Sequence, residues 1–168
     1  SLLDGKTGSP VPTGKTIKAG EFHNVTLHHF PKTNTYDFYL DGELIVKDMA
    51  ALAGKLKRGT VLAFFGGLGM GKTAFTRGLA KGMGIDCHVS SPTFAIVNDY
   101  GGNPALVHFD MYKVNTWEDL YSSGFFDYID MGAVIAAEWS ENIEKEIPED
   151  AIFVSISRVD EDTEGRRI

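Results

Sequence analysis

Short apolar runs separated by polar segments occupy the middle of the chain. Residues 60–65 form a compact, largely apolar run between glycines, which is typical of a strand buried on both faces of a parallel sheet. Farther along, Phe75, Leu79 and Met83 recur at intervals of four residues. This spacing predicts a helix whose apolar stripe packs against that sheet.

Four further apolar runs follow, at residues 94–97, 105–109, 133–137 and 151–156. Polar stretches that are compatible with helix, such as residues 116–122, separate them. An alternation of this kind predicts an α/β fold, in which helices are layered against a sheet.

The two ends of the chain have different patterns. Residues 1–35 are rich in Gly, Pro, Thr and Lys without helical periodicity, so we expect an extension of unknown role, a tag or an arm, before a domain at residues 36–168. Residues 36–40 alternate and predict a strand. The next apolar positions have the spacing of an amphipathic helix, at Ile45, Met49, Leu52 and Leu56. Gly165 predicts a hairpin turn into a final strand, and we expect the domain to be truncated inside that strand.

Composition narrows the class of protein. A chain of 168 residues that is 43% apolar and 23% charged is long enough for one sizeable core. The single cysteine, Cys87, cannot form an internal disulfide, and no apolar stretch approaches the length of a membrane span. We therefore expect a cytoplasmic protein that does not enter a membrane.

Acidic residues are concentrated in the second half of the chain. The formal net charge is −7, and residues 82–157 hold 13 acidic residues against Lys113 and Lys145, a local net charge of 2 − 13 = −11. Such a segment repels nucleic-acid backbone. It is either a solvated face or a docking surface for a basic protein.

The strongest chemical signal is the glycine-rich segment at residues 66–73, GGLGMGKT. It matches GxxxxGK[ST] and stands between a predicted strand and a predicted helix, as a phosphate-binding loop does. Glycines let backbone N–H groups turn toward phosphate oxygens, and the helix N-terminus favours the same anion. Lys72 is expected to neutralise phosphate oxygens, and Thr73 is expected to place its hydroxyl on Mg²⁺.

Two carboxylates end predicted strands. Asp110 follows the run at residues 105–109, and Glu138 follows the run at residues 133–137. At the carboxyl ends of parallel strands they would face the ligand crevice, as metal-linked groups or as a base that orients water; strand-terminal acids also serve as helix caps. The Ser90–Thr93 loop could present the Thr93 hydroxyl to a phosphate or a metal-bound water, or it could be a simple capped turn.

Other nucleotide-dependent classes fit less well. Small-molecule kinases need several Arg or Lys residues around the transferred phosphoryl group, whereas residues 82–157 contain no arginine. A GTPase would need an Asn-Lys-x-Asp motif, which does not occur, and a metal-binding Asp followed by x-x-Gly, whereas Asp110 is followed by Met111, Tyr112 and Lys113. ATP hydrolysis that is slow until a partner completes the site is therefore the expected chemistry. The alternative from a different class is a nucleotide-gated binding module whose hydrolysis is incidental.

Four motifs together resemble one known family. They are GGLGMGKT at 66–73, SSPTF at 90–94, HFDMYK at 108–113 and AEWSE at 137–141. In order and spacing they are similar to the TsaE (YjeE) family of bacterial tRNA threonylcarbamoyladenosine biosynthesis ATPases, over about residues 36–168. The resemblance implies a P-loop NTPase-like three-layer sandwich, with a mostly parallel central sheet flanked by helices.

The resemblance also implies an activity and partners. The protein would bind ATP and Mg²⁺ and hydrolyse ATP as a subunit of the machinery that makes N6-threonylcarbamoyladenosine at position 37 of tRNA. It would act with the TsaD and TsaB proteins and reach tRNA only indirectly, through that complex.

Individual roles follow from the resemblance. The implied catalytic residues are Lys72, Thr93, Asp110 and Glu138, and the implied metal-linked residues are Thr73, Asp110 and Glu138. The implied nucleotide-binding residues are Gly67, Leu68, Gly69, Met70, Gly71, Lys72, Thr73, Ala74 and Trp139. Trp139 has a plainer alternative as a packed aromatic beside the site.

Two positions depart from the family pattern. Met70 replaces the usual alanine, which a loop that binds through backbone donors tolerates. Lys113 replaces the usual arginine and supplies a point charge in place of a bidentate fork.

Overall fold

The computed structural model describes residues 52–158 and the strands at residues 2–3, 10–11, 23–30, 35–40, 43–46 and 166–167; side chains are described for residues 52–156. The described strands are β1 (Leu2–Leu3), β2 (Pro10–Val11), β3 (His23–Phe30), β4 (Thr35–Leu40), β5 (Glu43–Val46), β6 (Val61–Phe65), β7 (Val97–Gly102), β8 (Ala105–Asp110), β9 (Val134–Glu138), β10 (Ile152–Ser155), β11 (Ser157–Arg158) and β12 (Arg166–Arg167). The helices are α2 (Lys72–Gly82), α3 (Trp117–Ser122) and α4 (Phe125–Asp130), and the 3-10 segments are η1 (Met111–Lys113) and η2 (Ser140–Glu146).

A mostly parallel sheet organises the molecule. Its central strands lie in the order β3-β10-β6-β9-β8, and every neighbouring pair among them is parallel. At one end of this group, β7 pairs antiparallel with β8. At the other end, β12 and β4 each pair antiparallel with β3, and β5 pairs antiparallel with β4. The predicted α/β fold with a mostly parallel sheet is confirmed.

β6 lies at the centre of this sheet. It pairs on one side with β10 and on the other with β9, and Val61, Leu62, Ala63 and Phe64 are all almost completely buried. The apolar run predicted from the sequence is therefore a strand covered on both faces.

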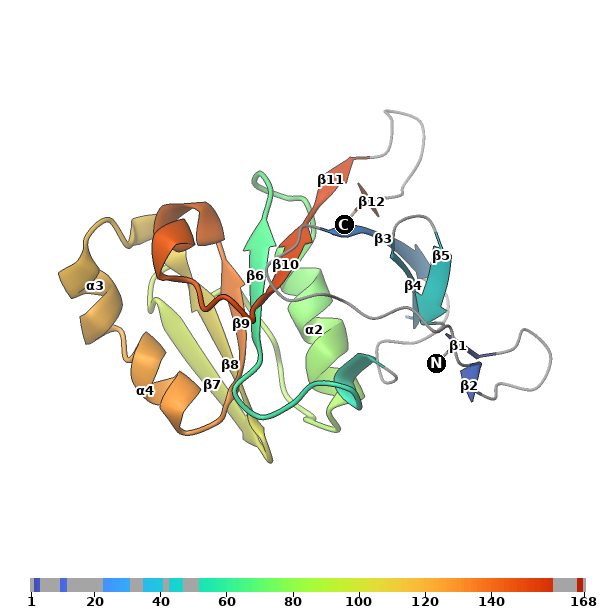
Figure 1. Cartoon of the computed structure of the whole chain (residues 1–168), viewed down its shortest axis with the longest axis horizontal. Helices are drawn as coiled ribbons and strands as arrows, with labels where there is room; N and C mark the ends of the chain where they lie inside the picture. Colours follow the sequence, from blue (N-terminus) through green and yellow to red (C-terminus); the bar gives the residue numbers. More distant parts are fainter. Residues whose placement is uncertain are drawn as a thin grey trace.

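Helices cover the two faces of the sheet separately. On one face, Phe75, Leu79 and Ala80 of α2 pack in one core cluster with alternate strand residues such as Phe64 and Ala136. On the other face a second cluster joins α3, α4 and η2 to the intervening strand residues. Figure 1 shows α3 and α4 on one side of the strands and α2 on the other, which gives three layers.

α2 begins and ends where its sequence predicts. The helix starts at Lys72, and the ring of Phe75 meets that of Phe64 edge to face at 5.0 Å between centroids. Its last residue is Gly82, after which Gly84 takes a φ of +73° and the Ile85 N–H donates to a helix carbonyl. The reversal at Gly84 ends the helix and returns the chain toward the sheet.

Some predicted elements differ from the structure. Ile45 lies in strand β5 rather than in a helix, because it is recruited into a hairpin with β4. Phe94 lies in an exposed turn, and the strand begins only at Val97. The short helix α4 was not predicted, since its six residues are too few to show a helical period.

The predicted extension at residues 1–35 contains β3, which pairs with the domain strand β10 through Val154↔His23 and Ser155↔Asn24. The boundary at residue 35 stays a prediction, as does truncation of the domain. Gly165, predicted to turn a hairpin, lies outside the described residues, although the strands on either side of it, β11 and β12, pair antiparallel.

None of the helices in the described part of the chain has the length and apolar character needed to span a bilayer.

We expect the Gly66→Ala variant to be less stable than the parent by about 2 kcal/mol or more. Gly66 has a φ of +137°, and a Cβ there would lie 2.3 Å from the carbonyl oxygen of Ile156. Gly67 is the matched control, because its φ is not in the left-handed region and a Cβ there would meet no atom within 4 Å. Urea denaturation of both variants checks this, and equal stabilities would contradict it.

Candidate active site

The loop between β6 and α2 leads into a helix N-terminus that has no side-chain cap. Gly71 is the N-cap residue in a left-handed conformation, with φ +113°, and as a glycine it makes no side-chain cap hydrogen bond to α2. The first N–H groups of a helix have no partner within the helix. This end of α2 therefore offers backbone donors and a positive dipole to an anion.

Lys72 is buried at the start of α2. Its side chain is 4% exposed, and its ammonium donates to the carbonyl oxygens of Gly66 and Gly67 and lies 4.2 Å from the centroid of the Trp139 ring. Burial lowers the pKa of Lys72 from its usual value, while the nearby carboxylates, Glu138 first among them, act in the opposite direction. The cation is thus held among neutral acceptors at the edge of the loop.

Glu138 ends strand β9 and lies beside the loop. Its Oε1 accepts from the Thr73 hydroxyl at 2.6 Å and lies 2.8 Å from Nε2 of His108. Side chains alternate across a strand, so Glu138 shares with Ala136 the sheet face that α2 covers. The strand end and the first turn of α2 are therefore joined by one short hydrogen bond.

Asp110 ends the neighbouring strand and holds the Ser90–Thr93 loop. Its Oδ2 accepts from the Thr93 hydroxyl at 2.6 Å and from the Ser91 hydroxyl at 2.9 Å, while Oδ1 accepts from the backbone N–H of Tyr112 at 3.0 Å. Asp110 also pairs with Glu138 in the register of β8 and β9. The cap predicted as the plainer alternative is real, and it coexists with a position beside the second carboxylate.

Strained backbone flanks both carboxylates. Among the described residues, the non-glycine positions with positive φ are Ile96, at +69°, and Trp139, at +59°. The carbonyl of Ile96 accepts from the Asp110 N–H, and Trp139 directly follows Glu138. Such conformations persist where the surrounding structure enforces them, which is typical of functional sites.

These groups line one cavity of about 320 Å³. Its lining is Leu68, Gly69, Met70, Gly71, Lys72, Thr73, Ser91, Thr93, Asp110, Glu138 and Trp139. The structure thus brings together most of the residues that the sequence singled out. Gly67 and Ala74 do not line the cavity, although the Gly67 carbonyl holds Lys72.

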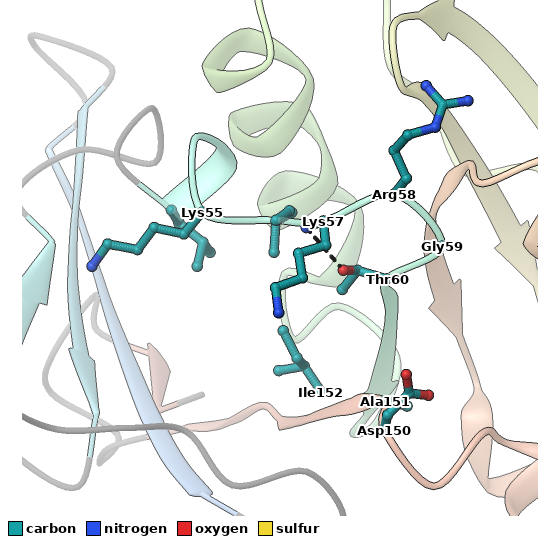
Figure 2. Close-up of a pocket in the computed structure, with 10 residues that line it drawn as sticks. Lys55, Lys57, Arg58, Gly59, Thr60, Asp150, Ala151 and Ile152 are labelled. Carbon is teal, nitrogen blue, oxygen red and sulfur yellow. Dashed lines mark hydrogen bonds between the residues drawn. The ribbon is translucent and has the colours of Figure 1, made fainter.

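A larger cavity, of about 410 Å³, lies where β6 and β10 begin, at the opposite edge of the sheet (Figure 2). Lys55, Lys57 and Arg58 contribute to its lining, together with Asp150. In Figure 2 the Arg58 guanidinium points away from the cavity, and it donates to the Asn103 side chain at 2.8 Å. This cavity lacks the glycine loop and the paired strand-end carboxylates of the first.

Two residues near the first cavity were missed from the sequence. His108 is buried against Glu138, and Glu141 accepts from the Gly66 N–H at 2.9 Å. The signal for His108 is strand periodicity, because a residue two positions before Asp110 must share its face. Glu141 carries no comparable signal, because it reaches the loop from η2.

The chain is similar to proteins of one family. The family model described as "Threonylcarbamoyl adenosine biosynthesis protein TsaE" matches residues 42–168. The tRNA threonylcarbamoyladenosine biosynthesis protein TsaE of Bacillus subtilis is 40% identical over 120 residues, which cover 70% of this chain and 72% of that protein. The protein of the same name from Treponema pallidum is 36% identical over 101 residues, covering 60% and 75%. The crystal structure of Bacillus subtilis YdiB aligns with a TM-score of 0.54 and 35% identity, covering 71% of this chain and 72% of that one.

The Asp110→Asn variant is expected to loosen the Ser90–Thr93 loop. An amide has one acceptor oxygen, so it cannot accept from both hydroxyls and also from the Tyr112 N–H as the two oxygens of the carboxylate do. Charge-assisted hydrogen bonds are also the stronger kind. The amides of Ala95 and Ile96, which donate to the Pro92 carbonyl, should exchange with deuterium about tenfold faster. Hydrogen-exchange mass spectrometry measures this, with the exposed Asp127→Asn variant as control. Unchanged exchange in Asp110→Asn would show that the carboxylate does not hold the loop.

Proposed function

This chain belongs to the TsaE family of threonylcarbamoyl adenosine biosynthesis proteins, and from that premise we propose that its 320 Å³ cavity binds ATP with Mg²⁺ and hydrolyses ATP. Its role lies in the threonylcarbamoyladenosine modification of tRNA, as the names of its relatives indicate. One observation carries the proposal: Lys72, Thr73 and two strand-end carboxylates meet at the uncapped N-terminus of α2.

The donors present suit a nucleotide and its metal. Backbone N–H groups of the loop and the Lys72 ammonium suit phosphate oxygens. The Thr73 hydroxyl and Glu138, already 2.6 Å apart, suit a hard cation that keeps most of its waters and needs only one or two protein ligands. No cluster of three or more His, Cys, Asp or Glu that could hold a metal by itself occurs in the described part of the chain. The metal would accordingly be shared between the protein and the phosphates.

Each protein group then has a task that its position allows. Bound Mg²⁺ supplies charge neutralisation on the phosphate oxygens. Glu138 orients the Thr73 hydroxyl. Lys72, which lines the cavity, would turn from the loop carbonyls to a bound phosphate. Asp110 accepts hydrogen bonds from Thr93 and Ser91 at the cavity. In our proposal Asp110 orients an attacking water and Thr93 contacts the terminal phosphate.

The charge of the residues that line the cavity favours ATP hydrolysis over transfer of the phosphoryl group to a metabolite. Lys72 is the only cation among the lining residues, whereas a kinase surrounds the transferred group with several. Lys113, the residue that replaces the family arginine, lies with its ammonium 4.9 Å from the ring centroid of exposed Phe94. Lys113 does not line the cavity, and in our proposal a partner protein recruits it.

Exposed apolar side chains at the rim support docking of TsaD and TsaB over the cavity. Leu68 is 85% exposed and Phe94 is 94% exposed. Leu68 itself lines the cavity, and Phe94 adjoins the lining residue Thr93. In our proposal the two side chains belong to one protein-binding surface, because contiguous exposed apolar patches mark such surfaces. In our proposal the partner proteins bury them and complete the catalytic site, and tRNA is reached only through that complex.

We predict that Lys72→Ala and Asp110→Ala each lower Mg²⁺-dependent phosphate release from ATP by about 100-fold or more while the fold survives. Lys72→Ala removes the cation that faces the phosphate oxygens, and Asp110→Ala removes the carboxylate that orients the attacking water. Lys81→Ala is the matched control, a solvent-exposed lysine in the last turn of the same helix. The assay is phosphate release, alone and with TsaB, TsaD and tRNA. Hydrolysis that persists in the folded Lys72→Ala variant would contradict the ATPase proposal. Modification that persists in Asp110→Ala would favour the nucleotide-gated binding module.

Phe94→Ala is predicted to reduce the partner-stimulated part of the ATPase rate about tenfold, more than it reduces the basal rate, because a buried aromatic anchor contributes about 2 kcal/mol or more to an interface. Met131→Ala is the control, since Met131 is also exposed, at 60%, but does not line this cavity. Titration of TsaB and TsaD into each variant provides the measurement. Equal stimulation of both variants would remove Phe94 from the interface.

A further inference from the structure

His108 is a buried polar residue to which the proposed chemistry gives no task. It is 0% exposed and does not line the cavity. Both of its ring nitrogens have partners: Nε2 lies 2.8 Å from Oε1 of Glu138, and Nδ1 lies 3.3 Å from the hydroxyl oxygen of Tyr100. A buried imidazole with a partner at each nitrogen connects two parts of the structure.

The sheet fixes this arrangement. β8 and β9 pair with His108 opposite Ala136 and Asp110 opposite Glu138, so the imidazole lies one pleat before the two carboxylates on the face under α2. The β7–β8 hairpin brings Tyr100 to the other side of the imidazole, with 6.2 Å between ring centroids. The three side chains therefore span three adjacent strands.

Hydrogen-bond accounting defines the direction of the link. A carboxylate only accepts, so Nε2 of His108 donates to Glu138, and in the neutral ring Nδ1 can then only accept. The Tyr100 hydroxyl has one hydrogen and two acceptors within reach, Nδ1 of His108 at 3.3 Å and the Ser90 carbonyl oxygen at 2.9 Å. The position of Ser90 thus decides whether that hydrogen is shared with the imidazole.

The far end of the link is the loop that Asp110 holds. The Ser90 N–H lies 3.3 Å from the Tyr100 hydroxyl, so Ser90 contacts Tyr100 through both of its backbone polar groups. Ser91 and Thr93, the next hydroxyl residues, donate to Asp110. A single loop is thereby attached to one carboxylate directly and to the other through Tyr100 and His108.

We propose that Tyr100 and His108 are positioning residues that couple the Ser90–Thr93 loop to Glu138, so that displacement of the loop changes the orientation of Glu138 and, through it, of the Thr73 hydroxyl. The coupling itself is a property of the chain. Its consequence for Mg²⁺ rests on the function proposed above. Removal of a residue that hydrogen-bonds to a metal-linked carboxylate typically weakens metal affinity 10- to 100-fold.

The coupling is tested without nucleotide, by the backbone amide resonances of the intact chain. In the Glu138→Ala variant the resonance of the Ser90 amide, which is linked to Glu138 through Tyr100 and His108, should shift relative to its position in the parent. When the same substitution is made in the Tyr100→Phe background, that shift should fall to less than about half, because the hydroxyl that carries the link is gone. Asn142, which is close to Glu138 in sequence and off the link, should shift equally in both backgrounds. An equal Ser90 shift in both backgrounds would overturn the coupling.

The consequence for the metal is tested with Mn²⁺ as the probe, by electron paramagnetic resonance in the presence of ADP. His108→Leu should weaken Mn²⁺ affinity about tenfold or more, and Tyr100→Phe, which keeps the packed ring, should weaken it less. His108→Gln should rescue most of the loss, because its amide can still donate to Glu138. In hydrolysis, the Mg²⁺ concentration for half-maximal rate should rise by the same factor, and the rate at saturating Mg²⁺ should largely recover.

The outcomes separate this inference from the proposed function. If the unaltered chain binds no Mn²⁺ with ADP, the proposed function fails, and the amide resonances still decide the coupling. If the unaltered chain binds Mn²⁺ and His108→Leu binds it with unchanged affinity, the proposed function stands and His108 is not a positioning residue.

Discussion

The parallel register of β6, β9 and β8 is the constraint on which the site depends. Glu138 lies opposite Phe64 on one side and opposite Asp110 on the other. Because parallel strands finish at the same edge of a sheet, both carboxylates come out beside the loop that follows β6. A slip of one residue in β8 or β9 would turn its carboxylate toward the face packed by α3 and α4 and bury it among apolar side chains. The apolar residues that fix this register therefore fix the site, although none of the apolar residues of β6, β8 and β9 lines the cavity.

Charge at this edge of the sheet suits the proposed nucleotide and metal, which together bring both signs. Two carboxylates and one ammonium line the cavity, and burial alone disfavours the charged form of Lys72. The Glu138 carboxylate, with smaller contributions from Glu141 and Asp110, opposes that effect. A bare polyphosphate would meet the backbone donors of α2 favourably but would be repelled by the carboxylates. A cation between phosphate and carboxylate resolves that repulsion, which is the electrostatic reason to expect nucleotide and metal together.

How far the sequence predicts this molecule depends on how local each signal is. The run at residues 60–65 and the spacing of Phe75 and Leu79 predict β6 and α2, because one strand and one helix turn are encoded by neighbours in the chain. Asp110 and Glu138 are predictable for the same reason, as each directly follows an apolar run. The strand at Ile45 was mistaken for helix, because pairing with β4 overrides the local periodicity. Glu141 could not be found, since its contact with the Gly66 N–H depends on where η2 crosses the loop.

Strain and exposure meet in the Ser90–Thr93 region, and together they suggest how a partner could act. Ile96 is held at a positive φ that costs about 1–3 kcal/mol, while Phe94, two residues earlier, lies almost wholly in solvent. The loop therefore owes its shape to hydrogen bonds with Asp110 and Tyr100 and to the burial of Pro92, and not to burial of Phe94. A protein surface that buries Phe94 would pull on a segment already attached to both carboxylates. Under the function and the coupling proposed above, docking beside the cavity would alter the geometry of Asp110 and Glu138 without any partner residue entering the cavity.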